Sequence, residues 1–235
     1  VVETCENRGD AFYIMDIAPN QTAGDTAIQN AVDLASQFDT NYASTYYPWV
    51  KIVDTNSNKI MPVPPSVVMM SVYAANDKVA AEWFAPAGLN RGGIPTAVSV
   101  ADRLTHTERD TLYEGKVNPI AAFPGQGVVA WGQKTLQRTP TALDRVNVRR
   151  LMFYLEKRIR TASRQLLFDP NDETFQRKFN SLATQILGQV KVGRGLYDYI
   201  VKADAELNTP DVIDRNEFRA QIGVQPTRAA EFMFI

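Results

Sequence analysis

The side chains that most often carry catalysis are scarce in this chain. One histidine, His106, and one cysteine, Cys5, occur among 235 residues. His106 lies inside a Thr-x-x-Glu capping-box pattern, Thr105–Glu108, so we expect it at the surface of a helix's first turn. A Cys–His nucleophile pair would require two residues about a hundred positions apart to meet by folding. The sequence therefore predicts no nucleophilic site, and a single cysteine allows no internal disulfide.

Sites for metals and nucleotides are also poorly supported. The acidic segment Asp169–Glu173 is the best candidate for a carboxylate site for Ca²⁺ or Mg²⁺, but it lacks the spacing of an EF-hand loop, and helix capping explains its acids. The glycine clusters Gly88–Gly93, Gly125–Gly127 and Gly193–Gly195 lack the Lys-Ser/Thr ending of a phosphate loop and the Gly-x-Gly-x-x-Gly of a dinucleotide site. We predict that the chain is not an enzyme and that it uses no metal and no cofactor.

Basic residues gather on one predicted helix, which runs from about residue 142 to 167 and has an apolar stripe on its other side. These residues are Arg145, Arg149, Arg150, Lys157, Arg158, Arg160 and Arg164, with Glu156 as the one acid among them. Such a face can be solvated with partners inside the chain, or it can bind an acidic protein or nucleic acid. The formal net charge of −1 disfavours nucleic acid. We expect reversal of Arg150, Lys157 and Arg164 to leave folding intact.

The elements that must position these side chains alternate between strand and helix in the first part of the chain. The pattern predicts a strand over Ala11–Ile17, then a loop around Pro19-Asn20 and Gly24, and then a helix capped by Asp25. Residues of β type follow over Tyr42–Val53, with a turn at Asn56–Asn58. After a segment broken by proline, Lys59–Pro65, the pattern predicts a helix over Ser66–Phe84. This alternation indicates an α/β layer.

The stretch Ala85–Pro95 is rich in Gly and Pro and predicts a connector between two lobes, over residues 1–90 and 91–235. The second lobe is predicted to contain the Thr105 helix, ended by Gly115, and a hairpin of Val117–Phe123 with Val128–Trp131. The basic helix follows, then a helix capped by Asp169-Pro170 and three antiparallel strands, Leu196–Ala203, Phe218–Val224 and Glu231–Ile235. The expected fold class is α/β (α+β), with a mixed or antiparallel sheet packed against helices in each lobe.

The composition is that of a globular protein, with 45% hydrophobic and 22% charged residues. The use of one cysteine fits a reducing compartment. No apolar run approaches the ~20 residues that a membrane helix needs. Because Val1 leads almost directly into a strand pattern and Ile235 ends one, we expect the sequence to be a piece cut from a longer protein.

Four segments in a characteristic order resemble the tail sheath proteins of contractile phages. Asn118–Leu136 has the Asn-Pro-Ile strand, the Gly-containing turn and the Trp-Gly strand. Asp144–Lys157 resembles the long helix that follows, and Phe168–Asn171 resembles the Phe-Glu-Pro-Asn region. Tyr197–Ile235 resembles the closing strands. The resemblance covers roughly residues 87–235 and is less sharp before them. The terminal extensions with which such subunits add strands to a neighbour's sheet are not evident.

The resemblance implies a structural subunit that polymerises around a tail tube and contracts to drive the tube through the host envelope. Its implied partners are other sheath subunits, the tube, and baseplate and tail terminator proteins, with no membrane or nucleic-acid partner. Its implied place is the phage tail of the virion, assembled in the host cytoplasm. Without extensions, we expect this piece to be monomeric. The alternative is a non-enzymatic module that uses helix 142–167 to bind an acidic protein or nucleic acid.

Under this resemblance two groups of residues become candidate contacts. The seven basic residues are candidates for an interface with the tube or an adjacent subunit. The last residues, Phe232, Met233, Phe234 and Ile235, are candidates for a strand edge shared between subunits.

Overall fold

The computed structural model of the chain describes residues 1–18 and 25–231. It divides into two compact units, Val1–Arg150 and Leu151–Ile235, here called unit 1 and unit 2. Each unit combines helices with a sheet, so the predicted α/β fold class is confirmed.

Unit 1 is built on a four-stranded sheet with the order β1-β2-β6-β7. Its strands are β1 (Tyr13–Asp16), β2 (Ala43–Tyr47), β6 (Val117–Phe123) and β7 (Gly127–Ala130). The first three are parallel and β7 returns antiparallel to β6, as the predicted hairpin requires. Every residue of β2 is buried, because helices cover both faces of a parallel sheet.

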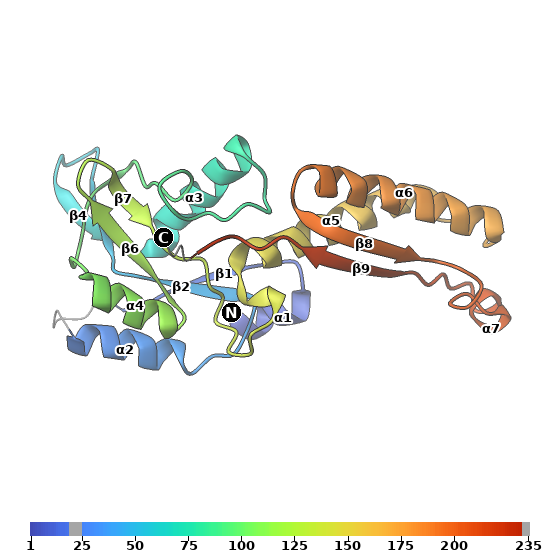
Figure 1. The fold of residues 1–235 in the computed structure, drawn as a ribbon, viewed down its shortest axis with the longest axis horizontal. Helices are drawn as coiled ribbons and strands as arrows, with labels where there is room; N and C mark the ends of the chain where they lie inside the picture. Colours follow the sequence, from blue (N-terminus) through green and yellow to red (C-terminus); the bar gives the residue numbers. More distant parts are fainter. Residues whose placement is uncertain (19–24, 232–235) are drawn as a thin grey trace. The chain divides into compact units, whose positions relative to one another are not determined.

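Helices α2 (Asp25–Ala35) and α4 (His106–Glu114) lie on one face of this sheet, and α3 (Pro65–Val79) lies on the other (Figure 1). The apolar residues of α2 at spacings of three and four, including Ile28, Ala31 and Ala35, form its buried side. The predicted capping box begins α4, since Thr105 Oγ1 accepts from the Glu108 amide and the Glu108 carboxylate accepts from the Thr105 amide. A short helix that the sequence did not predict, α1 (Val2–Arg8), precedes β1.

A second, antiparallel sheet in unit 1 has the order β4-β3-β5, with β3 (Val50–Val53), β4 (Ile60–Val63) and β5 (Ala97–Val100). The segment expected to be broken by proline is therefore a strand. Pro62 is tolerated because β4 lies at the sheet edge, where a missing N–H removes no bond to a second neighbour. The Asn56–Asn58 turn joins β3 to β4 as predicted.

The predicted lobe boundary near residue 90 differs from this division of the chain. The Gly88 amide donates to the Ala130 carbonyl at 2.9 Å, and the Ala130 amide donates to the Gly92 carbonyl at 2.8 Å. Ile94 likewise donates to Val128 at 2.9 Å. These bonds place the predicted connector Ala85–Pro95 along the edge of β7, inside unit 1. The division between the two units instead falls within helix α5 (Val146–Ser163), where no Gly or Pro marks the boundary.

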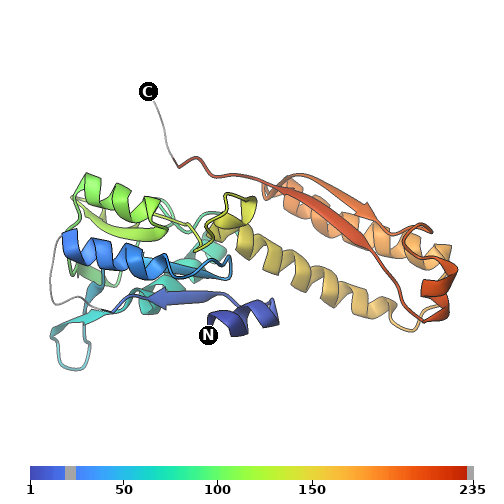
Figure 2. The same ribbon diagram turned by 90° about the horizontal axis from the view of Figure 1, so that it is seen from below.

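Unit 2 pairs helix α6 (Glu173–Val192) with a hairpin of β8 (Leu196–Lys202) and β9 (Gln221–Pro226), which lies along that helix (Figure 2). Phe179 and Ala183 of α6 pack with Val201 and Ile222 of the hairpin. The segment that connects β8 to β9 along the chain contains a short helix, α7 (Pro210–Asp214). Short 3-10 turns, η1 (Ala142–Asp144) and η2 (Arg164–Leu166), flank α5. The predicted long helix is confirmed over α5, but it does not start at residue 142, because Arg145 is extended between η1 and α5.

Two details of unit 2 correct the sequence prediction. The residue that caps α6 is Asp172, whose Oδ1 accepts from the Phe175 amide at 2.8 Å, and not Asp169. Strand β9 begins at Gln221, because the backbone N–H and C=O of Arg219 are bonded to the Asn208 side chain at 2.8 and 2.9 Å. Phe218 packs its ring against Phe175 and Phe179, at centroid distances of 4.9 and 5.0 Å. Of the predicted third strand, Glu231 is not in a strand and the remainder lies outside the described residues.

Candidate interaction surfaces

The two residues that could have formed a nucleophile pair have ordinary structural surroundings. His106 lies at the exposed start of α4, with its Nδ1 2.9 Å from a carboxylate oxygen of Asp110. Cys5 is buried in α1 as a free thiol. Neither arrangement places a base next to a nucleophile.

The acidic segment Asp169–Glu173 is engaged with neighbouring groups rather than gathered around a point. Asp169 pairs with Lys178 at 3.2 Å, Asp172 caps α6, and Glu173 pairs with Arg177 at 3.0 Å. In the described part of the chain, no three His, Cys, Asp or Glu side chains are grouped closely enough to hold a metal ion. The same residues include no helix that is both long and apolar enough to cross a membrane.

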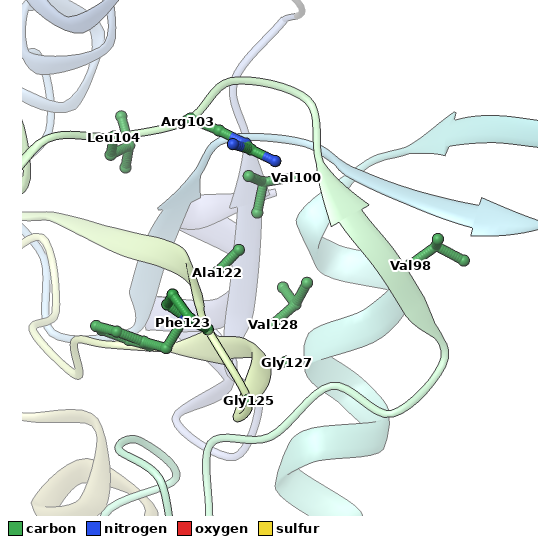
Figure 3. A pocket seen from close by; sticks show the side chains of 10 residues that line it. Val98, Val100, Arg103, Leu104, Ala122, Phe123, Gly125, Gly127 and Val128 are labelled. Carbon is green, nitrogen blue, oxygen red and sulfur yellow. The ribbon is translucent and has the colours of Figure 1, made fainter.

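Unit 1 contains a pocket of about 530 Å³ between β5, the loop that follows it and the β6–β7 hairpin (Figure 3). Most of the residues that line it have apolar side chains, including Val98, Leu104, Phe123 and Val128, but the surface that the pocket exposes is more polar than apolar. The one charged lining residue is Arg103, and no carboxylate, histidine or cysteine lines it. The lining thus places one cation, Arg103, among apolar side chains and backbone groups, without an acid–base pair.

The seven basic residues of the predicted interface do not form one surface, because the first three are used inside unit 1. Arg145 pairs with Asp144 at 2.8 Å. Arg149 is only 5% exposed, with its guanidinium 4.1 Å from the centre of the Tyr42 ring. Arg150 donates to Asp77 at 2.6 Å, and its side chain is 12% exposed. For these three residues, the structure supports the interpretation in which the basic side chains have their partners inside the chain.

Arg150 belongs to a buried polar group on the α3 side of the sheet. Its guanidinium lies 4.8 Å from the centre of the Tyr73 ring, and the Tyr73 hydroxyl is 2.8 Å from that of Tyr46. Burial raises the pKa of both phenols, so both stay neutral at ordinary pH. The neutral pair and the Asp77 carboxylate together accommodate the buried cation.

The remaining four basic residues, all in unit 2, are exposed. Arg158 bonds to the Tyr154 hydroxyl at 3.2 Å. The other three, Lys157, Arg160 and Arg164, follow one another at spacings of three and four and so lie on one side of the helix; we call them the cationic ridge. Among the described residues, no carboxylate lies within ion-pairing distance of any of the three. The ridge is the part of the predicted basic face that can meet a partner.

A second surface of unit 2 comes from its backbone. Strands β8 and β9 pair only with each other among the described residues, so the outer edge of each presents backbone N–H and C=O groups without a strand partner. Such edges can accept a strand from another chain. The predicted edge residues Phe232, Met233, Phe234 and Ile235 lie outside the described residues.

Two family models match the chain end to end. The model of the phage tail sheath protein central domain matches residues 1–136, and the model of the phage tail sheath C-terminal domain matches residues 138–235. Their junction falls closer to the structural division at residues 150 and 151 than to residue 90.

Curated relatives and solved structures agree with these models. The tail sheath protein of Enterobacteria phage T4 is 33% identical over 213 residues, which are 91% of this chain and 32% of that protein. The tail sheath protein of Vibrio phage KVP40 is 36% identical over 195 residues, 83% of this chain and 28% of that protein. The chain thus spans about a third of the length of these relatives.

Among solved structures, the contracted sheath of an extracellular contractile injection system (PVC) is similar, with a TM-score of 0.83 and 25% identity over 95% of this chain and 62% of that chain. The contracted helical sheath of the anti-feeding prophage gives a TM-score of 0.76, also at 25% identity, over 95% of this chain and 60% of that chain. Both units, the family models and these relatives lead to one assignment: the chain belongs to the phage tail sheath protein family.

Proposed function

We propose that this chain is part of a structural subunit of a contractile tail sheath, which polymerises around the tail tube and contracts to drive it through the host envelope. The observation that carries the proposal is that two sheath domain models together span nearly all of the chain. On this proposal the subunit works mechanically and without catalysis, in a tail assembled in the host cytoplasm. Its partners are neighbouring sheath subunits, the tube, and baseplate and terminator proteins.

The open edges of the β8–β9 sheet support a role in linking subunits. A sheet of two strands gains stability when further strands join it. Strand addition forms directional backbone hydrogen bonds while it leaves the two bodies free to turn about the connecting segment. A link of this kind suits subunits that must stay connected while they slide and rotate.

The cationic ridge supports a contact with an acidic surface of the tube or of an adjacent subunit. Lys157, Arg160 and Arg164 are exposed, and none of the three forms an ion pair with a carboxylate of the described residues. Exposed charges of one sign attract a complementary surface without the cost of burying them in isolation. Because water and salt screen exposed charges, each such contact is weak and can be broken when the tube moves.

The proposal is tested in the complete sheath protein with the triple variant Lys157→Glu, Arg160→Glu and Arg164→Glu. We expect the variant to fold, because all three side chains are exposed and form no ion pair, with its free energy of unfolding lowered by about 1 kcal/mol because acids replace the cations at the end of α5. We expect its affinity for preassembled tubes of the cognate tail tube protein, measured by cosedimentation, to fall about tenfold or more.

The matched control reverses three exposed cations of unit 1, Lys59→Glu, Lys78→Glu and Arg138→Glu, and changes the net charge equally. It should bind tubes like the parent protein. Equal loss in both variants would attribute the effect to net charge alone. Normal tails from the ridge variant, or tight binding of duplex DNA by the parent that falls steeply as salt rises, would contradict the proposed contact.

A further inference from the structure

Helix α3 of unit 1 has apolar residues on its outer side as well as on its buried side. Val68, Met69 and Val72 face the core. The exposed residues of the helix are Val67, Met70, Ser71, Ala74, Ala75, Lys78 and Val79, here called the α3 outer surface. Met70 is 62% exposed and Val79 is 78% exposed. A helix that is apolar all round is normally buried on every side.

The outer side of α6 shows what a solvated helix of this protein looks like. Apart from Val192, the exposed residues of α6 are polar or charged: Glu173, Thr174, Arg177, Lys178, Ser181, Thr184, Gln185, Gln189 and Lys191. The α3 outer surface has one charged residue, Lys78, near the end of the helix. Low charge and exposed aliphatic side chains are typical of the centre of an interface. The α3 outer surface therefore has the composition of a covered surface.

The strand that leads into α3 is also incompletely covered. Strand β4 is separated from α3 by Pro64 alone, and its residues Ile60 and Met61 are 60% and 43% exposed. In the described part of the chain, β4 pairs with β3 and with no strand on its other side. Pro62 disfavours the addition of a further strand at this edge. A covering segment would therefore contact side chains of α3 and β4 rather than extend the sheet.

The relatives of this chain contain enough polypeptide to supply such a segment. The matched region makes up 32% of the tail sheath protein of phage T4 and 28% of that of phage KVP40. About two thirds or more of each of these proteins therefore lies outside the region that this chain matches. Domains of one polypeptide commonly bury about 600–1,500 Å² against each other.

The apolar character of the surface favours a cover from the same polypeptide over a second subunit. If every free subunit exposed an apolar helix, the subunits would associate non-specifically before they assembled. Interfaces this low in charge are typical of permanent associations. On the proposed function, contacts between subunits must instead change when the sheath contracts. A permanent contact fits better inside one polypeptide.

We propose that the α3 outer surface is a docking surface for the part of the complete sheath polypeptide that lies outside residues 1–235. This inference rests on the proposed function, because it takes the complete protein to be a sheath subunit longer than this chain. The contact would fix a further part of the subunit to unit 1 while unit 2 remains available to bind neighbours.

The test is the rate at which a maleimide modifies a cysteine placed on this surface. Met70→Cys is introduced into the complete sheath protein, monomers are isolated by size exclusion, and modification of the peptide that contains residue 70 is followed by mass spectrometry. The matched control is Asn30→Cys, on the exposed polar side of α2 in the same unit. We expect residue 70 to react about tenfold or more slowly than residue 30, because the cover must open first.

A second measurement guards against a local effect of the cysteine. Met70→Glu should lower the melting temperature of the complete protein, because it places a charge without a partner in an apolar interface. The same substitution in the chain of residues 1–235 should leave the melting temperature nearly unchanged, since Met70 is exposed there. In that chain the cysteines at positions 70 and 30 should also react at similar rates.

The outcomes identify the occupant. Slow reaction at residue 70 in the monomer supports the proposal. Protection that arises only when subunits assemble would assign the surface to a second copy, and protection only around the tube would assign it to the tube; either result overturns the proposal. Fast reaction in every state, or slow reaction already in the chain of residues 1–235, also overturns it.

The labelling result is independent of the test of the proposed function. If the ridge triple variant loses tube binding while residue 70 reacts fast in every state, the sheath contact stands and the docking surface is refuted. If residue 70 is protected in the monomer while the ridge triple variant forms normal tails, the docking surface stands and the ridge contact is refuted.

Discussion

Arg150 shows how a surface-looking cation can be part of a core. Its guanidinium packs against the Tyr73 ring and donates to Asp77, a residue 73 positions away on α3. Removal of Arg150 leaves the Asp77 carboxylate partly buried without its partner, which is a costly state. The structure therefore argues against the prediction that the charge of Arg150 can be reversed without an effect on folding.

At the residue scale we predict that Arg150→Ala lowers the free energy of unfolding by about 2–3 kcal/mol, measured by urea denaturation. Arg160→Ala, on the exposed part of the same helix, is the control and should change it by less than about 0.5 kcal/mol. Equal effects of the two substitutions would show that the helix has one uniform face.

Sequence reasoning at this scale succeeded where the partner is close in the chain. The capping box of Thr105 and Glu108 could be read because its two residues are three positions apart. The burial of Arg149 and Arg150 could not, because Tyr42 and Asp77 lie far away in the sequence. The helical spacing shows on which side of the helix Arg149 and Arg150 lie. It does not show which distant residues pack against that side.

At the scale of elements, the Ala85–Pro95 stretch behaves as part of unit 1. A Cβ added at Gly92 would lie 2.5 Å from the Ala130 carbonyl oxygen, whereas one added at Gly93 would meet nothing within 4 Å. The neighbouring glycines thus differ sharply in the space around them. A flexible connector would not distinguish them.

We predict that Gly92→Ala destabilises the chain by about 2 kcal/mol or more, since backbone atoms must move to admit the methyl group. Gly93→Ala should be tolerated with little change. Thermal unfolding of both variants checks this, and similar melting temperatures for the two would mean that the stretch is a loose link after all.

Strands and helices with a strong apolar period were predictable, and elements at sheet edges were not. Strand β6 was predicted with its bounds intact, because Val117–Phe123 is a buried β-type run next to a Gly turn. Strand β4 was missed because Pro62 reads as a breaker, and only its edge position makes the proline harmless. The division within α5 carries no local signal, since a continuous helix passes through it.

At the scale of the whole molecule, the two units differ in the surfaces that could bind other subunits. The main sheet of unit 1 has helices on both faces, and residues 88–94 bond along the β7 edge. Unit 2 presents the two open strand edges and the cationic ridge. We therefore expect unit 2 to make the contacts that connect subunits to one another and to the tube.

The most direct test is a cryo-electron microscopy map of tails assembled from the complete sheath protein around its tube. The account predicts that strands from neighbouring subunits extend the β8–β9 sheet and that the helix carrying Lys157, Arg160 and Arg164 faces acidic side chains of the tube. A map in which both outer edges of the β8–β9 sheet remain without a strand partner, and in which the cationic ridge faces solvent, would contradict it.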